Sequence, residues 1–106
     1  MKDKAYLMSV FNSKMKKKYK GFFVVVNEKG LHTRPSTELL RCATSFKADV
    51  TLKYQQEIVN AKSLLGILIL AADKGAKINV EAVGEDAEEA VKAILTLARN
   101  KFNINY

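Results

Sequence analysis

The stretch Gly30-Leu31-His32-Thr33-Arg34-Pro35-Ser36 lies where the apolar pattern of the chain changes from that of a strand to that of a helix. Before it, the β-branched and aromatic run Phe22 to Val26 predicts a strand buried on much of both faces. After it, a helix beginning at Thr33 and ending near Lys47 has one apolar face, made of Leu39, Leu40, Ala43 and Phe46. The stretch should therefore bring His32, the only histidine, to a helix N-terminus, where backbone N–H groups and the helix dipole favour an anion.

Three more strands are predicted further along the chain. Residues 48–54 and residues 77–83 both alternate apolar and polar side chains, which is typical of half-buried strands. Gln55-Gln56 separates the first of these from residues 57–60. The two segments should form a hairpin, although the turn contains no glycine.

Two more helices complete the pattern. The dense apolar run from Ser63 to Ala72 predicts one, with Ser63 as its N-cap. Asp86-x-x-Glu89 fits a capping box at the start of the other, whose buried stripe is Ala87, Ala90, Val91, Ile94, Leu95, Ala98 and Phe102. The order β-α-β-β-α-β-α predicts an α+β open-faced β-sandwich, with a four-stranded antiparallel sheet covered on one face by three helices.

The composition is that of one ordinary globular domain: 106 residues, 48% hydrophobic and 27% charged. The longest apolar runs are well short of the roughly 18 residues that a membrane helix needs, so no stable membrane insertion is expected. The single cysteine, Cys42, cannot form an internal disulfide, and its place in a helical pattern beside Leu39, Leu40 and Ala43 predicts a small buried hydrophobe. A reducing, cytoplasmic compartment is the expected location.

The net charge of +7 is concentrated at the N-terminus. Residues 1–20 contain seven lysines and one aspartate, which leaves a net charge of only +1 for residues 21–106. We therefore expect a basic, flexible N-terminal extension, 1–20, and one folded domain, 21–106, with Met15 as a possible alternative translation start. No arginine or aromatic interleaving accompanies the lysines, so no nucleic-acid partner is expected, although binding of nucleic acid or anionic membrane by this extension stays an alternative.

Two segments resemble the signatures of one known family. Gly30-Leu31-His32-Thr33-Arg34-Pro35 is similar to the active-site signature of HPr, the histidine-containing phosphocarrier of the phosphoenolpyruvate-dependent sugar phosphotransferase system. Asn60-Ala61-Lys62-Ser63-Leu64-Leu65-Gly66 resembles the second signature of that family, around a regulatory serine. The likeness runs from about Phe22 to Phe102, with Ser36 standing where many members have a small apolar residue.

The resemblance implies a role for each of these residues. His32 would accept a phosphoryl group from enzyme I at Nδ1 and pass it to a histidine of enzyme IIA. Arg34 would pair with the phosphoryl oxygens, and Pro35 would maintain the geometry of the corner. Ser63 would be a site for HPr kinase/phosphorylase, whose action slows transfer and promotes binding to a transcriptional regulator. The best-matched docking positions are Leu64 and Leu65.

The chemistry expected of these residues agrees with the resemblance. A neutral imidazole is a competent nucleophile, and a guanidinium offers several donors to a phosphate. Neither group needs a metal or a cofactor, and a monomeric carrier, not a stand-alone turnover enzyme, is expected. A regulatory phosphoprotein acting through Ser63, or a nitrogen-type phosphotransferase relay, remains the alternative, because the relay would use the same His32.

Overall fold

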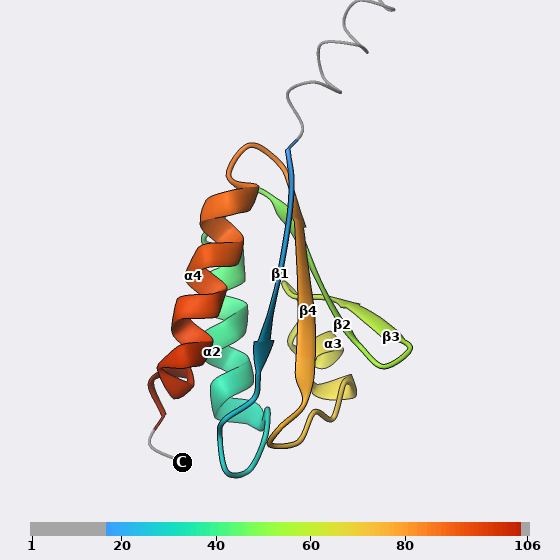
Figure 1. Cartoon of the computed structure of the whole chain (residues 1–106), viewed down its shortest axis with the longest axis vertical. Helices are drawn as coiled ribbons and strands as arrows, with labels where there is room; N and C mark the ends of the chain where they lie inside the picture. The colour runs from blue at the N-terminus through green and yellow to red at the C-terminus, as the bar shows by residue number, and fades with distance from the viewer. Residues whose placement is uncertain (1–16, 105–106) are drawn as a thin grey trace, which may run out of the picture.

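The computed structural model describes residues 17–104. Its elements follow one another in the order strand, helix, two strands, helix, strand, helix, and a 3-10 turn follows the last helix (Figure 1). Their bounds are β1 (Lys18–Val24), α2 (Thr33–Thr44), β2 (Asp49–Tyr54), β3 (Glu57–Asn60), α3 (Leu64–Ile69), β4 (Lys77–Val83), α4 (Ala87–Arg99) and η1 (Lys101–Asn103).

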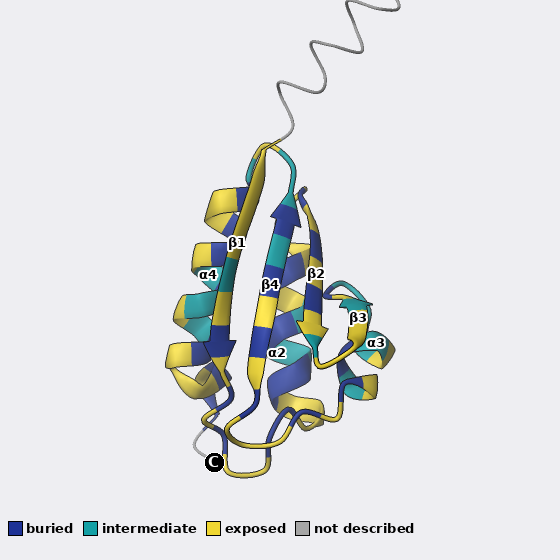
Figure 2. Ribbon diagram, turned by 45° about the vertical axis from the view of Figure 1, so that its right-hand side comes forward, coloured by how far each residue is buried: buried dark blue, intermediate teal, exposed yellow. Residues whose placement is uncertain are grey.

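The four strands form one antiparallel sheet with the order β1-β4-β2-β3. Helices α2 and α4 cover one face, and the strand residues that point toward them are buried, as the alternating colours of β4 show (Figure 2). Leu39 of α2, Leu52 and Ile78 of the sheet, and Ile94 of α4 are completely buried in this core. The predicted fold class, an open-faced β-sandwich with helices on one face, is therefore confirmed.

The first strand differs from its prediction in length and in burial. It begins at Lys18, four residues before the expected start, so Lys18 and Lys20 belong to the sheet and not to the basic extension. The prediction that Phe22 to Val26 is buried on much of both faces is wrong: Phe23 and Val25 are buried, whereas Phe22 is 54% exposed. The reason is that only one face of the sheet carries helices. Residues 1–16 of the predicted extension lie outside the described residues.

The ends of the helices also differ from the sequence pattern. Helix α2 stops at Thr44 and α3 at Ile69, each three residues before its predicted end. Phe102 is buried as expected, but it lies in η1 with a φ of 55° and not on α4. Phe102 therefore continues the apolar pattern of α4 in the sequence, although it lies beyond the end of that helix.

The predicted capping box at Asp86 is not formed. Asp86 is the N-cap of α4, but its side chain makes no capping hydrogen bond to that helix. Its carboxylate instead accepts hydrogen bonds from the backbone N–H groups of Lys47, at 2.9 Å, and Ala48, at 2.8 Å. These hydrogen bonds, chiefly the one from the Lys47 N–H group, hold the pKa of Asp86 below its usual value. Asp86 thus joins the start of α4 to the connection between α2 and β2.

Candidate functional site

His32 is the N-cap residue of α2 and its side chain is exposed. Its backbone is extended, with φ −71° and ψ −176°, and its carbonyl accepts the first hydrogen bond of the helix, from the Ser36 N–H at 2.9 Å. Pro35 is buried in the first turn, where a residue without an N–H group costs no helical hydrogen bond. The predicted position of His32 at a helix start is therefore what the fold provides.

Contacts on both sides hold the backbone of this corner. Before His32, the Leu31 N–H donates to the carbonyl of Ala72 at 2.9 Å, which joins the corner to the connection between α3 and β4. After it, the buried Ser36 hydroxyl donates to the Leu31 carbonyl at 3.0 Å. Gly30 precedes both with φ +72°, and a Cβ there would lie 2.4 Å from the Ala72 carbonyl oxygen. The loop before α2, the connection after α3 and the C-terminal turn meet at this end of the molecule (Figure 1).

The sequence interpretation missed part of this support. It treated Ser36 only as a tolerated departure from a small apolar residue, whereas its hydroxyl is buried and hydrogen-bonded. It also missed the Glu28 carboxylate, which pairs with the Lys74 ammonium at 2.6 Å and links the two loops. That contact lowers the pKa of Glu28, but both groups are exposed and such pairs stabilise little. The only sign of the Ser36 contact in the sequence was a serine within an apolar helix face. Nothing in the sequence indicated the contact between Glu28 and Lys74.

Arg34 is exposed on the first turn of α2, two residues after His32. It lines a shallow hollow of about 300 Å³ together with Thr33, Thr37, Glu38 and the C-terminal residues Asn103 and Ile104. The hollow places a guanidinium, hydroxyl groups and a carboxylate beside the helix N-terminus. The guanidinium and hydroxyl groups can donate hydrogen bonds to the oxygens of a phosphoryl group, whereas the Glu38 carboxylate, which pairs with Arg41 at 3.1 Å, cannot.

Ser63 is the N-cap of α3, as predicted, and it is half-buried. Its Oγ accepts a hydrogen bond from the Gly66 N–H at 3.1 Å. Just before it, the Asn60 side chain accepts from the Lys62 N–H at 2.8 Å and shapes the turn into the helix. Helix α3 packs against α2 and β3, so the helices that begin at His32 and at Ser63 are neighbours.

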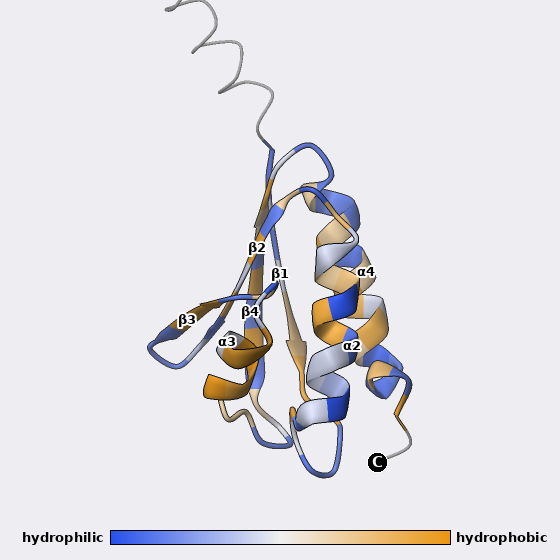
Figure 3. Ribbon diagram, turned by 180° about the vertical axis from the view of Figure 1, so that it is seen from behind, coloured by the Kyte–Doolittle hydropathy of each residue, from blue (hydrophilic) through white to orange (hydrophobic). Residues whose placement is uncertain are grey.

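Helix α3 is largely hydrophobic (Figure 3), and its apolar residues are divided between the core and the surface. Ile67 is completely buried and Leu70 is 5% exposed, whereas Leu65 is 70% and Ile69 55% exposed. Leu64, the other predicted docking residue, is half-buried. The expected exposed patch therefore exists, with Leu65 and Ile69 as its most accessible members.

Residues 17–104 contain no group of three or more His, Cys, Asp and Glu side chains placed to hold a metal ion. None of their helices has the length and apolar character needed to cross a membrane.

An open-faced β-sandwich with an exposed histidine at the start of its first long helix is the arrangement of a small phosphocarrier protein. The family model described as PTS HPr component phosphorylation site matches residues 20–100. The solved HPr-C-His of Thermoanaerobacter tengcongensis is 32% identical, with a TM-score of 0.79 over 83% of this chain and 99% of that one. HPr of Bacillus anthracis is 34% identical, with a TM-score of 0.71 over 74% of this chain and 94% of its own.

A third relative is Crh, a catabolite repression protein of Bacillus subtilis, described as a swapped, intertwined dimer. It is 32% identical, with a TM-score of 0.64 over 71% of this chain and 86% of that one. Some relatives are thus dimers, and the predicted monomer stays a prediction. The chain belongs to the HPr family, the phosphocarrier proteins of the phosphotransferase system.

Proposed function

We propose that this protein carries a phosphoryl group on His32, received from enzyme I and delivered to a histidine of enzyme IIA in sugar uptake. The observation that carries the proposal is the exposed imidazole at the N-cap of α2, within the segment that matches the family's phosphorylation-site model. An exposed side chain suits a carrier, because two different partners must reach the same nitrogen in turn. A buried backbone corner suits it as well, because phosphoryl transfer depends chiefly on positioning.

The proposed chemistry needs no metal or cofactor on this chain. The neutral Nδ1 of His32 attacks the phosphorus of the enzyme I phosphohistidine, forming one P–N bond as the other breaks. Arg34 and the backbone N–H groups at the start of α2 hold the phosphoryl oxygens, and Pro35 keeps the first turn in place. Delivery to enzyme IIA is the same exchange with His32 as the donor. The histidine is regenerated at each cycle.

The exposed part of α3 is the proposed docking surface for both partners. Leu64, Leu65 and Ile69 present apolar side chains on a helix that packs against α2. Burying such side chains at the centre of an interface is the usual source of binding energy between proteins. Their position beside the histidine helix would let one interface both recognise a partner and align the two histidines.

Ser63 is proposed as a regulatory phosphorylation site that slows phosphoryl transfer through this surface. Its half-buried Oγ accepts from the Gly66 N–H, so a phosphate there would sit at a helix N-terminus and add about −1.5 to −2 charges beside the docking leucines. HPr kinase/phosphorylase is the proposed modifying enzyme, and a transcriptional regulator the proposed partner of the modified form. The likeness to Crh, named for catabolite repression, favours this second function.

The test is phosphorylation of the full chain by phosphoenolpyruvate and enzyme I, followed by intact mass measurement. Wild-type protein should gain one acid-labile phosphoryl group, His32→Ala should gain none, and Ser63→Ala should gain one as wild type does. Arg34→Lys should still be phosphorylated, but more slowly, because an ammonium replaces the planar fork of donors. A phosphoryl group retained by His32→Ala would overturn the assignment.

A purely regulatory protein, or a nitrogen-type relay, predicts different results. If the protein signals only through Ser63, then Ser63→Ala should abolish partner binding and His32→Ala should leave it intact. A nitrogen-type relay would show the same phosphorylation of His32 but no transfer to a sugar-specific enzyme IIA. Transfer from the phosphorylated protein to purified enzyme IIA therefore separates the three.

A further inference from the structure

The C-terminal turn η1 has three consecutive residues in the left-handed region of backbone conformation. Lys101, Phe102 and Asn103 have φ values of 56°, 55° and 62°, and none of them is glycine. Residues with a side chain adopt this region at a cost and normally one at a time, as Gln55 and Ala71 do here. One left-handed residue after the last turn is enough to end a helix such as α4, so the helix end accounts for Lys101 alone. The conformation of Phe102 and Asn103 needs another explanation.

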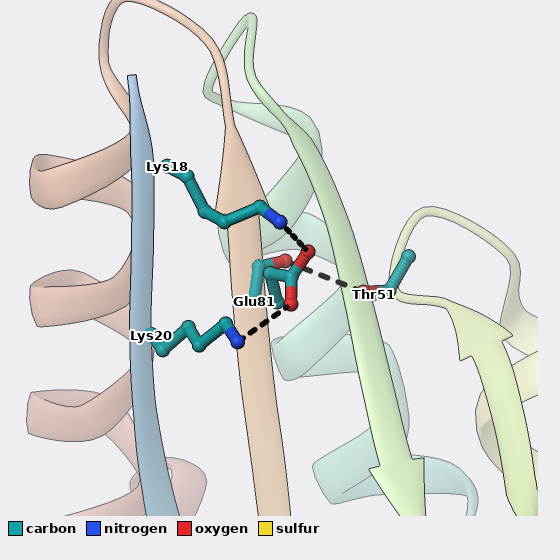
Figure 4. A network of polar contacts seen from close by, with 4 residues as sticks. All are labelled: Lys18, Lys20, Thr51 and Glu81. Carbon is teal, nitrogen blue, oxygen red and sulfur yellow. Dashed lines mark hydrogen bonds and ion pairs between the residues drawn. The ribbon is translucent and has the colours of Figure 1, made fainter.

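Polar contacts between elements elsewhere in the described chain form without such strain. On the face of the sheet that carries no helices, Lys18 and Lys20 of β1 pair with the Glu81 carboxylate of β4 at 3.5 and 3.7 Å (Figure 4). All three residues lie on neighbouring extended strands, so their contacts follow directly from the strand pairing. The turn differs from this network, because its backbone is unfavourable by itself and has to be held.

Contacts with the core and with the loop before His32 hold the turn. The Phe102 ring is completely buried and meets the Phe23 ring edge-on, with the ring centroids 5.7 Å apart. The side-chain amide of Asn27, which is buried in the loop between β1 and α2, donates to the Lys101 carbonyl at 3.0 Å. The left-handed turn is therefore fixed to the loop that carries His32, although it lies at the far end of the chain.

This conformation brings Asn103 to the helix that begins at His32. The turn packs against α2, and the two lie at the same end of the molecule (Figure 1). Asn103 lines the hollow of about 300 Å³ that Arg34 also lines. The next residue, Ile104, is buried and donates its N–H to the Lys101 carbonyl at 3.0 Å, so the chain is held on both sides of Asn103. A side-chain amide is thus placed at the hollow beside a guanidinium.

An amide suits a position beside Arg34. A guanidinium has only donors, so an amide next to it can present its carbonyl oxygen. The Glu38 carboxylate lines the same hollow, but it pairs with Arg41. A neutral acceptor orients the guanidinium without neutralising its charge, which stays available for the oxygens of a phosphoryl group. A carboxylate in place of the amide would hold the guanidinium more strongly but would repel those oxygens.

We infer that Asn103 is a positioning residue, whose side-chain amide accepts a hydrogen bond from the Arg34 guanidinium and directs it toward the phosphoryl group on His32. The inference rests on the proposed function, in which Arg34 holds the phosphoryl oxygens. The left-handed turn is the means of positioning, because it returns the chain from the end of α4 to the start of α2. Backbone strain that the surrounding contacts maintain in this way is typical of functional sites.

The test compares two glycine variants of the same turn. Asn103→Gly removes the amide, and the matched control Lys101→Gly removes the side chain of an equally left-handed residue that does not line the hollow. Both proteins should fold, because glycine adopts a positive φ readily, and urea unfolding verifies this. With enzyme I as the donor, Asn103→Gly should lower kcat about fivefold, the effect of one ordinary hydrogen bond, and leave KM unchanged. Lys101→Gly should leave kcat unchanged.

A double-mutant cycle tests whether Asn103 acts through Arg34. On an Arg34→Ala background, Asn103→Gly should lower kcat less than about twofold further. Asn103→Asp, which tolerates the same backbone, should also slow transfer, because its charge repels the phosphoryl oxygens. Equal losses with and without Arg34, a wild-type kcat for Asn103→Gly, or a change in KM alone would overturn the inference.

Phosphoramidate separates this inference from the proposed function. This small donor phosphorylates histidine without enzyme I, so intact mass measurement gives a rate for His32 in each variant. Asn103→Gly should again be about fivefold slower than Lys101→Gly. If enzyme I failed to phosphorylate the wild-type protein, the proposed function would be refuted, and the phosphoramidate rates would still decide the role of Asn103. Equal rates for the two glycine variants would show that Asn103 does not position Arg34.

Discussion

Replacing Gly30 by alanine tests the corner that holds His32. Gly30 has φ +72°, and a Cβ would lie 2.4 Å from the Ala72 carbonyl oxygen and 3.0 Å from the Asp73 Cα. Neither atom belongs to a flexible side chain, and the Ala72 carbonyl accepts the Leu31 N–H. Gly30→Ala must therefore either strain the turn or break that hydrogen bond.

The matched control is Gly75→Ala, because Gly75 has φ +92° but nothing within 4 Å of its Cβ position. The left-handed conformation alone should cost the control about 1 kcal/mol. Overpacking and the weakened hydrogen bond should raise the loss for Gly30→Ala to about 3 to 4 kcal/mol.

Urea unfolding measures both losses, as a lower midpoint with an unchanged slope. Gly30→Ala should also slow phosphorylation of His32 by enzyme I under conditions where both variants are folded, whereas Gly75→Ala should not. Equal losses of stability in the two variants would refute the argument, because they would mean that the close approach to Ala72 carries no energy.

Three further predictions concern Asp86, Ser63 and Cys42. The depressed pKa of Asp86 means that its stabilisation is fully present above the ordinary aspartate value of about 3.9 and is lost as pH falls through the lower folded value. Asp86→Asn should thus lower stability near neutral pH and lose less stability than wild type on acidification below about pH 4, as measured by urea unfolding at each pH. Ser63→Ala should cost about 1 kcal/mol by removing the α3 cap, and Ser63→Asp should restore much of it; equal stability of all three proteins would contradict this. Burial raises the pKa of the Cys42 thiol, so iodoacetamide should alkylate it more slowly at pH 8 than it alkylates the unfolded chain, and equal rates would contradict that shielding.

The element order could be predicted because periodicity along a segment reports which residues share a face. Ile78, Val80 and Ala82 alternate in β4 as expected, and all three are buried. Helix ends were less predictable, because apolar residues continue past the last helical hydrogen bond. After α3, Ala71 already has φ 49° and Ala72 is buried in the connection to β4.

Some features of the candidate site could likewise be predicted from the sequence, and others could not. A turn followed by a helical pattern was enough to predict that His32 begins a helix and that Ser63 caps one, since both signals are local. The support for the corner comes from Ala72, and no local signal reports a contact so distant in the chain. The same is true of the exposure of Leu65, which depends on how α3 packs against its neighbours.

The sequence by itself determined the order of elements, the phosphocarrier signatures and the amount of positive charge. Only the tertiary structure decided that Phe22 is exposed, that the Asp86 carboxylate accepts hydrogen bonds from the connection before β2, and that Lys53 and Lys77 share a surface with the lysines of β1. The physical reason is that a pattern shows which side chains lie on the same side of one element. Which side is covered, and which distant groups meet there, depends on how the elements pack.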